Sequence, residues 1–63
     1  DIPARIIRRA LTLLRPGGLL LMEHSPSQDE ALRAYATSVG MVDAATEADL
    51  TGRMRFLRAR TPR

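Results

Sequence analysis

The feature that most constrains the fold of this chain is a short apolar run, GLLLM, at residues 18–22. It follows a proline–glycine turn and ends at an acidic residue, Glu23. Apolar residues without alternation are typical of a strand that is covered on both faces, as in parallel sheets. Periodicity by itself does not exclude a short helix, but the flanking glycines and the acidic stop favour a strand over residues 18–23. Such a strand needs two covering layers, and a chain of 63 residues can supply them only thinly.

An amphipathic helix is predicted before this strand, over residues 3–14. Pro3 suits the first helical position, where its missing N–H is not needed. Apolar residues recur on one side of the helix and arginines occupy the other, which indicates a helix packed against a sheet. Pro16 disfavours helix in the residue before it, and Gly17 accepts positive φ, so the helix ends there.

A second helix is predicted after the strand, with its start inside residues 25–30, SPSQDE. Either Ser25 or Ser27 can cap it, the first with proline next in the chain and the second with a reciprocating glutamate. The side expected to be buried is formed by Leu32, Tyr35, Ala36 and Val39. Gly40 is the expected stop.

Two further strands are predicted, a weak one over residues 41–46 and a last one over residues 53–60, joined by the loop EADLTG. In the last strand Met54 and Phe56 alternate with arginines, and then the alternation changes phase. This change predicts a β-bulge or a change of covering layer between Phe56 and Leu57. The tail TPR is expected to be frayed.

The expected order is therefore helix, strand, helix, strand, strand, which is an α/β arrangement. The strand–helix–strand unit over residues 18–46 predicts a right-handed crossover between parallel strands. The last strand follows a short loop and is expected to return antiparallel, which would give a mixed sheet.

Composition limits the classes of function. A domain of this size has a small core, and a chain without cysteine and with one histidine has neither a disulfide nor a metal cluster to stabilise it. We therefore expect no metal, and the lack of cysteine is consistent with a reducing, cytoplasmic compartment. No apolar segment approaches the length of a membrane span, so no membrane association is expected.

The basic residues of the chain are ten arginines, and the formal net charge is +3. Because arginine suits contact with phosphate, a small nucleic-acid-binding module stays open as an alternative. The two aromatic residues, Tyr35 and Phe56, do not interleave with the arginines as stacking residues would. We therefore favour a solvated arginine surface and expect no nucleic-acid partner.

Glu23 and His24 are the adjacent titratable pair at the end of a predicted strand. Ligands of open α/β sheets bind beyond the carboxyl ends of the strands, so both residues are candidates for a pocket wall. The alternative is that Glu23 ties down a neighbouring loop and His24 packs beside the helix start. Ser25 and Ser27 are interpreted as helix caps and not as nucleophiles, because the chain has no second histidine to complete a catalytic triad. No catalytic, cofactor-binding or metal-binding residue is predicted.

The stretches LLRPGGLLLMEHSPSQDEALRAYATSVGM and DLTGRMRFLRAR closely resemble the C-terminal end of the release-factor glutamine methyltransferases, the HemK/PrmC family. The PGG turn alone is common to many methyltransferases, whereas its combination with the other motifs is more specific. Ser25 stands where the family usually has glycine. The matching residues are Pro16, Gly17, Gly18, Glu23, His24, Gln28, Asp49, Leu50, Gly52 and Arg55.

This resemblance implies a Rossmann-like class I fold in which the last strand is inserted antiparallel. It implies methyl transfer from S-adenosylmethionine to the glutamine side-chain amide in the GGQ motif of peptide chain release factors, which would be the partners. The family's glycine-rich cofactor loop and its NPPY motif do not occur in this chain. We therefore expect residues 1–63 to be the C-terminal portion of an incomplete methyltransferase domain, inactive alone. A fragment of another class I methyltransferase, acting on a small molecule or nucleic acid, stays open as an alternative.

Overall fold

The computed structural model describes residues 2–53 and 55–63. Asp1 lies outside the described residues, as does Met54 with its part of the predicted alternation. The elements follow in the expected order. They are α1 (Ile2–Leu13), β1 (Leu19–His24), the 3-10 turn η1 (Pro26–Gln28), α2 (Asp29–Ser38), β2 (Val42–Ala48) and β3 (Arg55–Arg60). The predicted order, helix, strand, helix, strand, strand, is confirmed.

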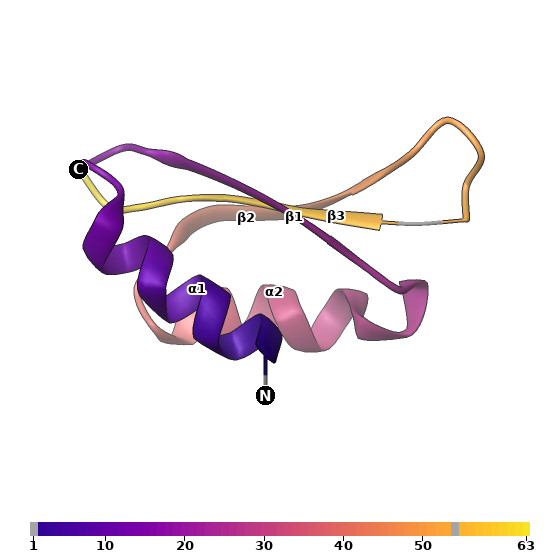
Figure 1. Cartoon of the computed structure of the whole chain (residues 1–63), viewed down its shortest axis with the longest axis horizontal. Helices are drawn as coiled ribbons and strands as arrows, with labels where there is room; N and C mark the ends of the chain where they lie inside the picture. The colour runs from indigo at the N-terminus through magenta and orange to yellow at the C-terminus, as the bar shows by residue number, and fades with distance from the viewer. Residues whose placement is uncertain (1, 54) are drawn as a thin grey trace.

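The three strands form one sheet in the order β1-β3-β2, with both helices on the same face (Figure 1). β3 pairs antiparallel with β1 and with β2. β1 and β2 therefore run in the same direction, as the crossover predicts, but β3 lies between them. The prediction of a mixed sheet is wrong for the described residues, because each strand pairing in them is antiparallel.

Burial along β1 alternates, so the prediction that this strand is covered on both faces is wrong for this chain. Met22 and His24 are buried against the helices, whereas Leu19 and Leu21 lie on the opposite face and are exposed. The reason is that both helices pack on one side of the sheet (Figure 1). The core is formed by Ile7, Met22, Leu32, Ala36, Met41, Leu57 and Ala59.

The predicted bulge between Phe56 and Leu57 is also wrong. β3 keeps a continuous register with β1, from Leu19 opposite Arg60 to His24 opposite Arg55. Leu57 and Ala59 are buried against the helices, and Phe56 lies with Arg58 and Arg60 on the open face. One uninterrupted alternation therefore accounts for the whole of β3. The irregularity lies instead in β2, where the register shifts between Val42 and Ala45 and Asp43 has a φ of 56°.

The PGG turn is fastened to the end of β3 by Thr61, which is buried. The Thr61 Oγ1 accepts from the Gly18 N–H at 2.9 Å and donates to the Arg15 carbonyl at 2.7 Å. The Thr61 N–H donates to the Gly18 carbonyl at 2.9 Å, and the Gly17 N–H donates to the Thr61 carbonyl at 3.2 Å. The prediction of a frayed tail is therefore wrong at Thr61, because the turn supplies partners for its polar atoms.

Replacing Thr61 by valine preserves the shape of the side chain and removes its hydroxyl. We expect Thr61→Val to lower the free energy of unfolding by about 0.5–1.5 kcal/mol, because two hydrogen bonds of the hydroxyl are lost while the Gly18 N–H still donates to the Arg15 carbonyl at 2.9 Å. Urea denaturation followed by circular dichroism measures this change. Thr12→Val is the matched control, since the Thr12 hydroxyl donates to the Arg9 carbonyl on an exposed helix. Equal midpoints for the two variants would contradict the structural role of Thr61.

None of the described helices has the length and apolar character needed to cross a membrane.

Candidate functional site

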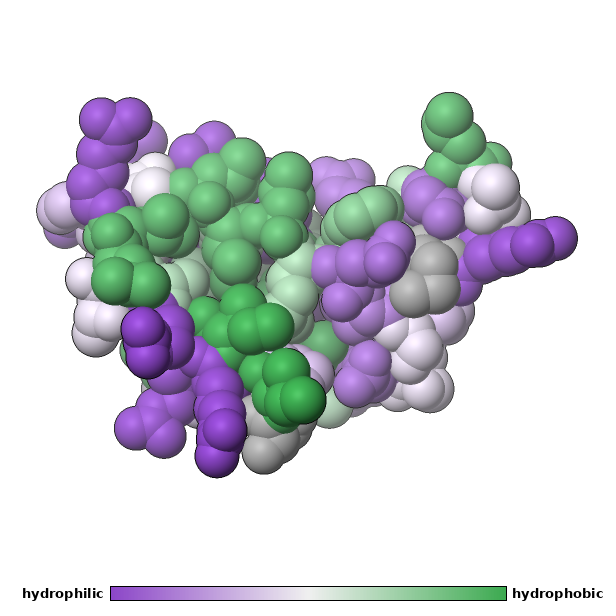
Figure 2. Space-filling view, viewed as in Figure 1, coloured by the Kyte–Doolittle hydropathy of each residue, from purple (hydrophilic) through white to green (hydrophobic). Residues whose placement is uncertain are grey.

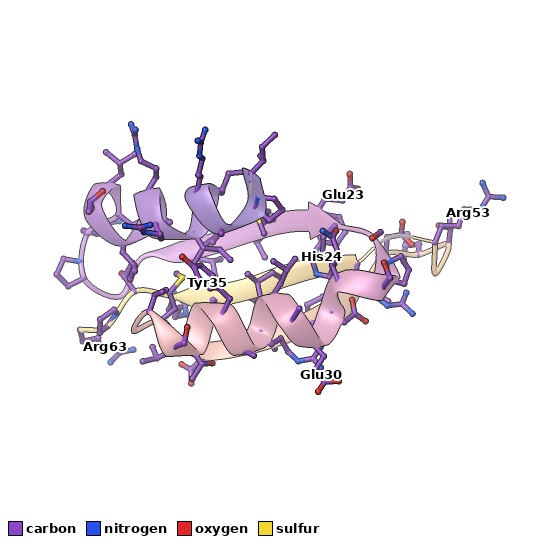
Figure 3. All side chains as sticks on the ribbon, turned by 90° about the horizontal axis from the view of Figure 1, so that it is seen from below. Glu23, His24, Glu30, Tyr35, Arg53 and Arg63 are labelled. Atoms are coloured by element: carbon purple, nitrogen blue, oxygen red, sulfur yellow. The ribbon has the colours of Figure 1, made fainter. Side chains whose placement is uncertain are left out.

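The two residues predicted for a pocket wall lie at the carboxyl end of β1 but on opposite faces of the sheet. Successive side chains of a strand alternate in direction, so Glu23 is exposed on the open face while His24 is buried on the helix face (Figure 3). Glu23 is opposite Phe56 in the register and His24 is opposite Arg55. The structure therefore does not bring the carboxylate and the imidazole together in one site.

His24 belongs to a polar cluster that joins β1, α2 and β3. Its Nδ1 lies 2.9 Å from the Ser25 carbonyl oxygen and 3.5 Å from Asp29 Oδ1. The other carboxylate oxygen of Asp29 lies 3.5 Å from Arg55 Nε, and Arg55 Nη1 donates to the Gly52 carbonyl at 2.9 Å. The Asp29 carboxylate at the start of α2 thus lies between a histidine and an arginine from two adjacent strands.

The same cluster contains two buried polar atoms that make no hydrogen bond within the described part of the chain, His24 Nε2 and Asp29 Oδ1. His24 is 4% exposed, so its imidazole has almost no contact with solvent. A metal would need further ligands, and no group of three acidic or histidine side chains suited to a metal occurs among the described residues. The geometry assigns the cluster a bracing role between elements.

The turn after β1 is closed by Gln28, in agreement with the cap prediction for Ser25. Gln28 Oε1 accepts from the Ser25 N–H at 3.1 Å and from the Ser25 hydroxyl at 3.2 Å. The hydroxyls of Ser25 and Ser27 lie 3.1 Å apart, so both serines are engaged in this turn. Ser25 has φ −75° and ψ 154°, an extended conformation that any residue can adopt.

The loop between β2 and β3, residues 49–53, projects from the body of the molecule at the end of the sheet where β1 also finishes (Figure 1). Asp49 Oδ1 accepts from the Thr51 N–H at 3.0 Å and from the Thr51 hydroxyl at 2.9 Å. The Gly52 N–H donates to the Asp49 carbonyl at 3.2 Å, and the Arg53 N–H donates to Thr51 Oγ1 at 3.2 Å. These bonds give the loop a defined shape, with Leu50 fully exposed at 107%.

A shallow apolar groove of about 570 Å³ lies between α1 and β1. Hydrophobic side chains gather over this part of the molecule in the space-filling view (Figure 2). Arg5 and Arg9 flank the groove, and none of the described residues that line it is acidic. Its exposed apolar members are Ile2, Ile6, Leu13, Leu19 and Leu21.

The PGG turn does not form a cradle for a cofactor. The N–H groups of Gly17 and Gly18 donate to Thr61, so they are not available to a ligand. A Cβ at Gly18 would lie 2.9 Å from both the Arg15 carbonyl oxygen and Leu14 Cβ, which shows that the glycine permits close packing of the chain itself. The PGG turn therefore offers no free backbone donor to a cofactor such as S-adenosylmethionine.

The sequence did not reveal the roles of Asp29 and Thr61. The ion pair that the structure shows for Arg55 is with Asp29. Asp29 and Arg55 are 26 positions apart in the sequence. They come together because β3, which begins with Arg55, pairs with β1, which ends shortly before Asp29.

Three curated proteins are similar to this chain, and all three bear the name release factor glutamine methyltransferase. The protein of Bifidobacterium longum is 52% identical over 56 residues, which are 89% of this chain and 19% of that protein. The protein of Deinococcus radiodurans is 40% identical over 60 residues, which are 95% of this chain and 21% of that protein. The protein of Xylella fastidiosa is 45% identical over 49 residues, which are 78% of this chain and 18% of that protein.

The chain thus spans about a fifth of the length of the curated relatives it matches. The resemblance predicted from the motifs is confirmed over most of the chain. No protein-family model matches the chain, and no solved structure matches it.

Proposed function

We propose, from the similarity of this chain to one segment of release factor glutamine methyltransferases, that it is the C-terminal portion of such a methyltransferase domain. The full-length enzyme would transfer a methyl group from S-adenosylmethionine to the glutamine side-chain amide in the GGQ motif of a peptide chain release factor. The observation that carries this proposal is 52% identity over 89% of the chain. This identity favours a protein substrate, the release factor, over a small molecule or a nucleic acid.

The one-sided sheet supports the view that the domain is incomplete. β1 lies at an edge of the described sheet, and its side chains Leu19 and Leu21 are exposed on the open face. Both leucines also line the apolar groove along α1, and an exposed apolar patch of this kind marks an interaction site. We propose that the open face and the groove along α1 pack against the rest of the domain.

Within such a domain the residues of this chain have supporting roles. The PGG turn offers no free backbone N–H to the methyl donor, and the positioning of donor and amide supplies most of the rate in a transfer of this type. We propose that Glu23, exposed at the carboxyl end of β1, lines the substrate side, while His24 braces β1 against α2. The chain by itself would be inactive.

The test is a chimera in which this chain replaces its matching segment in the Bifidobacterium longum enzyme. We expect the chimera to methylate a peptide chain release factor, with kcat/KM within about tenfold of the parent, equivalent to a loss of about 1.4 kcal/mol in transition-state stabilisation. Transfer of a labelled methyl group, followed by mass spectrometry of the GGQ peptide, measures both rate and position.

The 63-residue chain alone is the negative control and should transfer no methyl group. A chimera that is folded and binds S-adenosylmethionine, yet leaves the release factor unmethylated, would contradict the proposed function. Methylation of the control chain would contradict the view that the domain is incomplete.

A further inference from the structure

We infer that the loop of residues 49–53 is a docking element for the protein substrate, with Leu50 and Arg53 as its contact residues. This inference rests on the proposed function and adds to it a specific surface of this chain. It follows from where the loop lies, how it is ordered and what it exposes.

The location of the loop follows from the strand directions. β1 and β2 run the same way because both pair antiparallel with β3, so their carboxyl ends lie at one end of the sheet. The loop leaves the carboxyl end of β2, and Glu23 lies at the carboxyl end of β1. In the larger α/β domain proposed above, ligands would bind beyond the carboxyl end of β1, so the loop would lie beside the region where the substrate reacts.

The loop is ordered by its own hydrogen bonds and by its anchor to the sheet. The Asp49 carboxylate accepts two bonds from Thr51, and Arg55 at the start of β3 donates to the Gly52 carbonyl. Gly52 has a φ of 74°, a conformation that favours glycine. A surface that is ordered before binding loses little conformational entropy when it docks, which is the usual source of tight recognition by short loops.

The side chains that this order presents have no role in the core of the chain. Leu50 is fully exposed, at 107%, whereas Leu57 and Ala59 on β3 of the same hairpin are 0% exposed. Arg53 is exposed as well and extends away from the body of the molecule (Figure 3). An apolar tip beside a cation is suited to a protein surface that offers a hydrophobic pocket next to an acidic group.

A protein substrate fits these residues better than a nucleic acid. The loop contains no aromatic residue that could stack on a base, and its tip residue is aliphatic. A leucine tip also requires an apolar partner surface, which a folded protein supplies.

The chimera described above allows the inference to be tested on an active enzyme. We expect Leu50→Ala to raise the KM for the release factor about tenfold, as truncation of a contact residue at an interface commonly does, and Arg53→Ala to raise it about threefold. The turnover number at saturating release factor and the KM for S-adenosylmethionine should stay unchanged, because neither residue reaches the reacting atoms.

Two controls separate docking from folding. Leu50→Met retains an apolar tip and should keep the parent KM. Arg63→Ala removes an exposed arginine at the opposite end of the molecule (Figure 3) and should also leave the KM unchanged. Circular dichroism verifies that each variant is folded.

The failure of this inference is distinguishable from the failure of the proposed function. An active chimera in which Leu50→Ala and Arg53→Ala leave the KM for the release factor at the parent value would overturn the docking role alone. Weaker binding of RNA by the Arg53→Ala variant, with an unchanged KM for the release factor, would likewise overturn it. An inactive chimera contradicts the enzyme assignment itself.

Discussion

Truncation of Leu57 to alanine should leave much of the 63-residue chain unfolded at 25 °C. Leu57 is 0% exposed and lies on β3, the central strand, where its side chain faces the helices. Large-to-small changes at such positions cost about 2–5 kcal/mol, because burial is lost and a cavity is left. The core of a chain this short rarely supplies more than about 3–5 kcal/mol, so the change removes most of the stability.

Leu21→Ala is the matched control for this variant. Leu21 lies on the neighbouring strand but on the open face, where it is 57% exposed, and its truncation should change the unfolding free energy by only about 0.5 kcal/mol. Urea titration followed by far-ultraviolet circular dichroism compares the two. Similar midpoints for the two variants would show that the helices do not cover the face of the sheet that carries Leu57.

Gly18→Ala should have the second largest effect on stability. The added Cβ would lie 2.9 Å from the Arg15 carbonyl oxygen and 2.9 Å from Leu14 Cβ. One of these contacts is backbone and the other is a Cβ atom, so neither can move away as a flexible side chain would. Overpacking of this type costs about 1–3 kcal/mol, and displacement of the turn would also disturb the bonds to Thr61.

The control for Gly18→Ala is Arg15→Ala, which truncates an exposed side chain in the same turn and keeps the carbonyl that Thr61 uses. We expect it to lie within about 0.5 kcal/mol of the parent. Thermal unfolding monitored by circular dichroism ranks the three proteins. A Gly18→Ala chain as stable as the parent would mean that the turn relaxes without loss.

Local signals were sufficient for the elements themselves. Pro3 near the start of α1, and Pro16 with Gly17 beyond its end, limit that helix to Ile2–Leu13, within one residue of the prediction. The cap at Ser25 and the stop at Gly40 define the segment that contains η1 and α2. Such signals work because a helix end must satisfy its own backbone groups with residues close in sequence.

Signals that depend on distant residues could not be predicted. Nothing near residue 61 indicates that its hydroxyl meets the PGG turn, since the partners are more than 40 positions away in sequence. The phase change at Phe56 suggested a bulge or a change of covering layer. Phe56 lies on the open face of the sheet, where its side chain is half-buried. Which face of a sheet receives helices is a property of the whole fold.

The candidate site was predicted in position but not in geometry. The carboxyl end of β1 is indeed where Glu23 and His24 lie, and strand alternation alone separates them to opposite faces. The cluster of His24 with Asp29 and Arg55 required the order of the strands, because Arg55 reaches Asp29 only once β3 has paired beside β1.

The position of β3 between β1 and β2 has a consequence for the order of folding during synthesis. β1 and β2 are each bonded to β3 and not to one another, so neither has a sheet partner in this chain until the third strand has left the ribosome. Helix formation can proceed early, since its contacts are local, but sheet formation has to wait for residues 55–60. Of these three strands, the one synthesised last is therefore the one on which the hydrogen bonding between them depends.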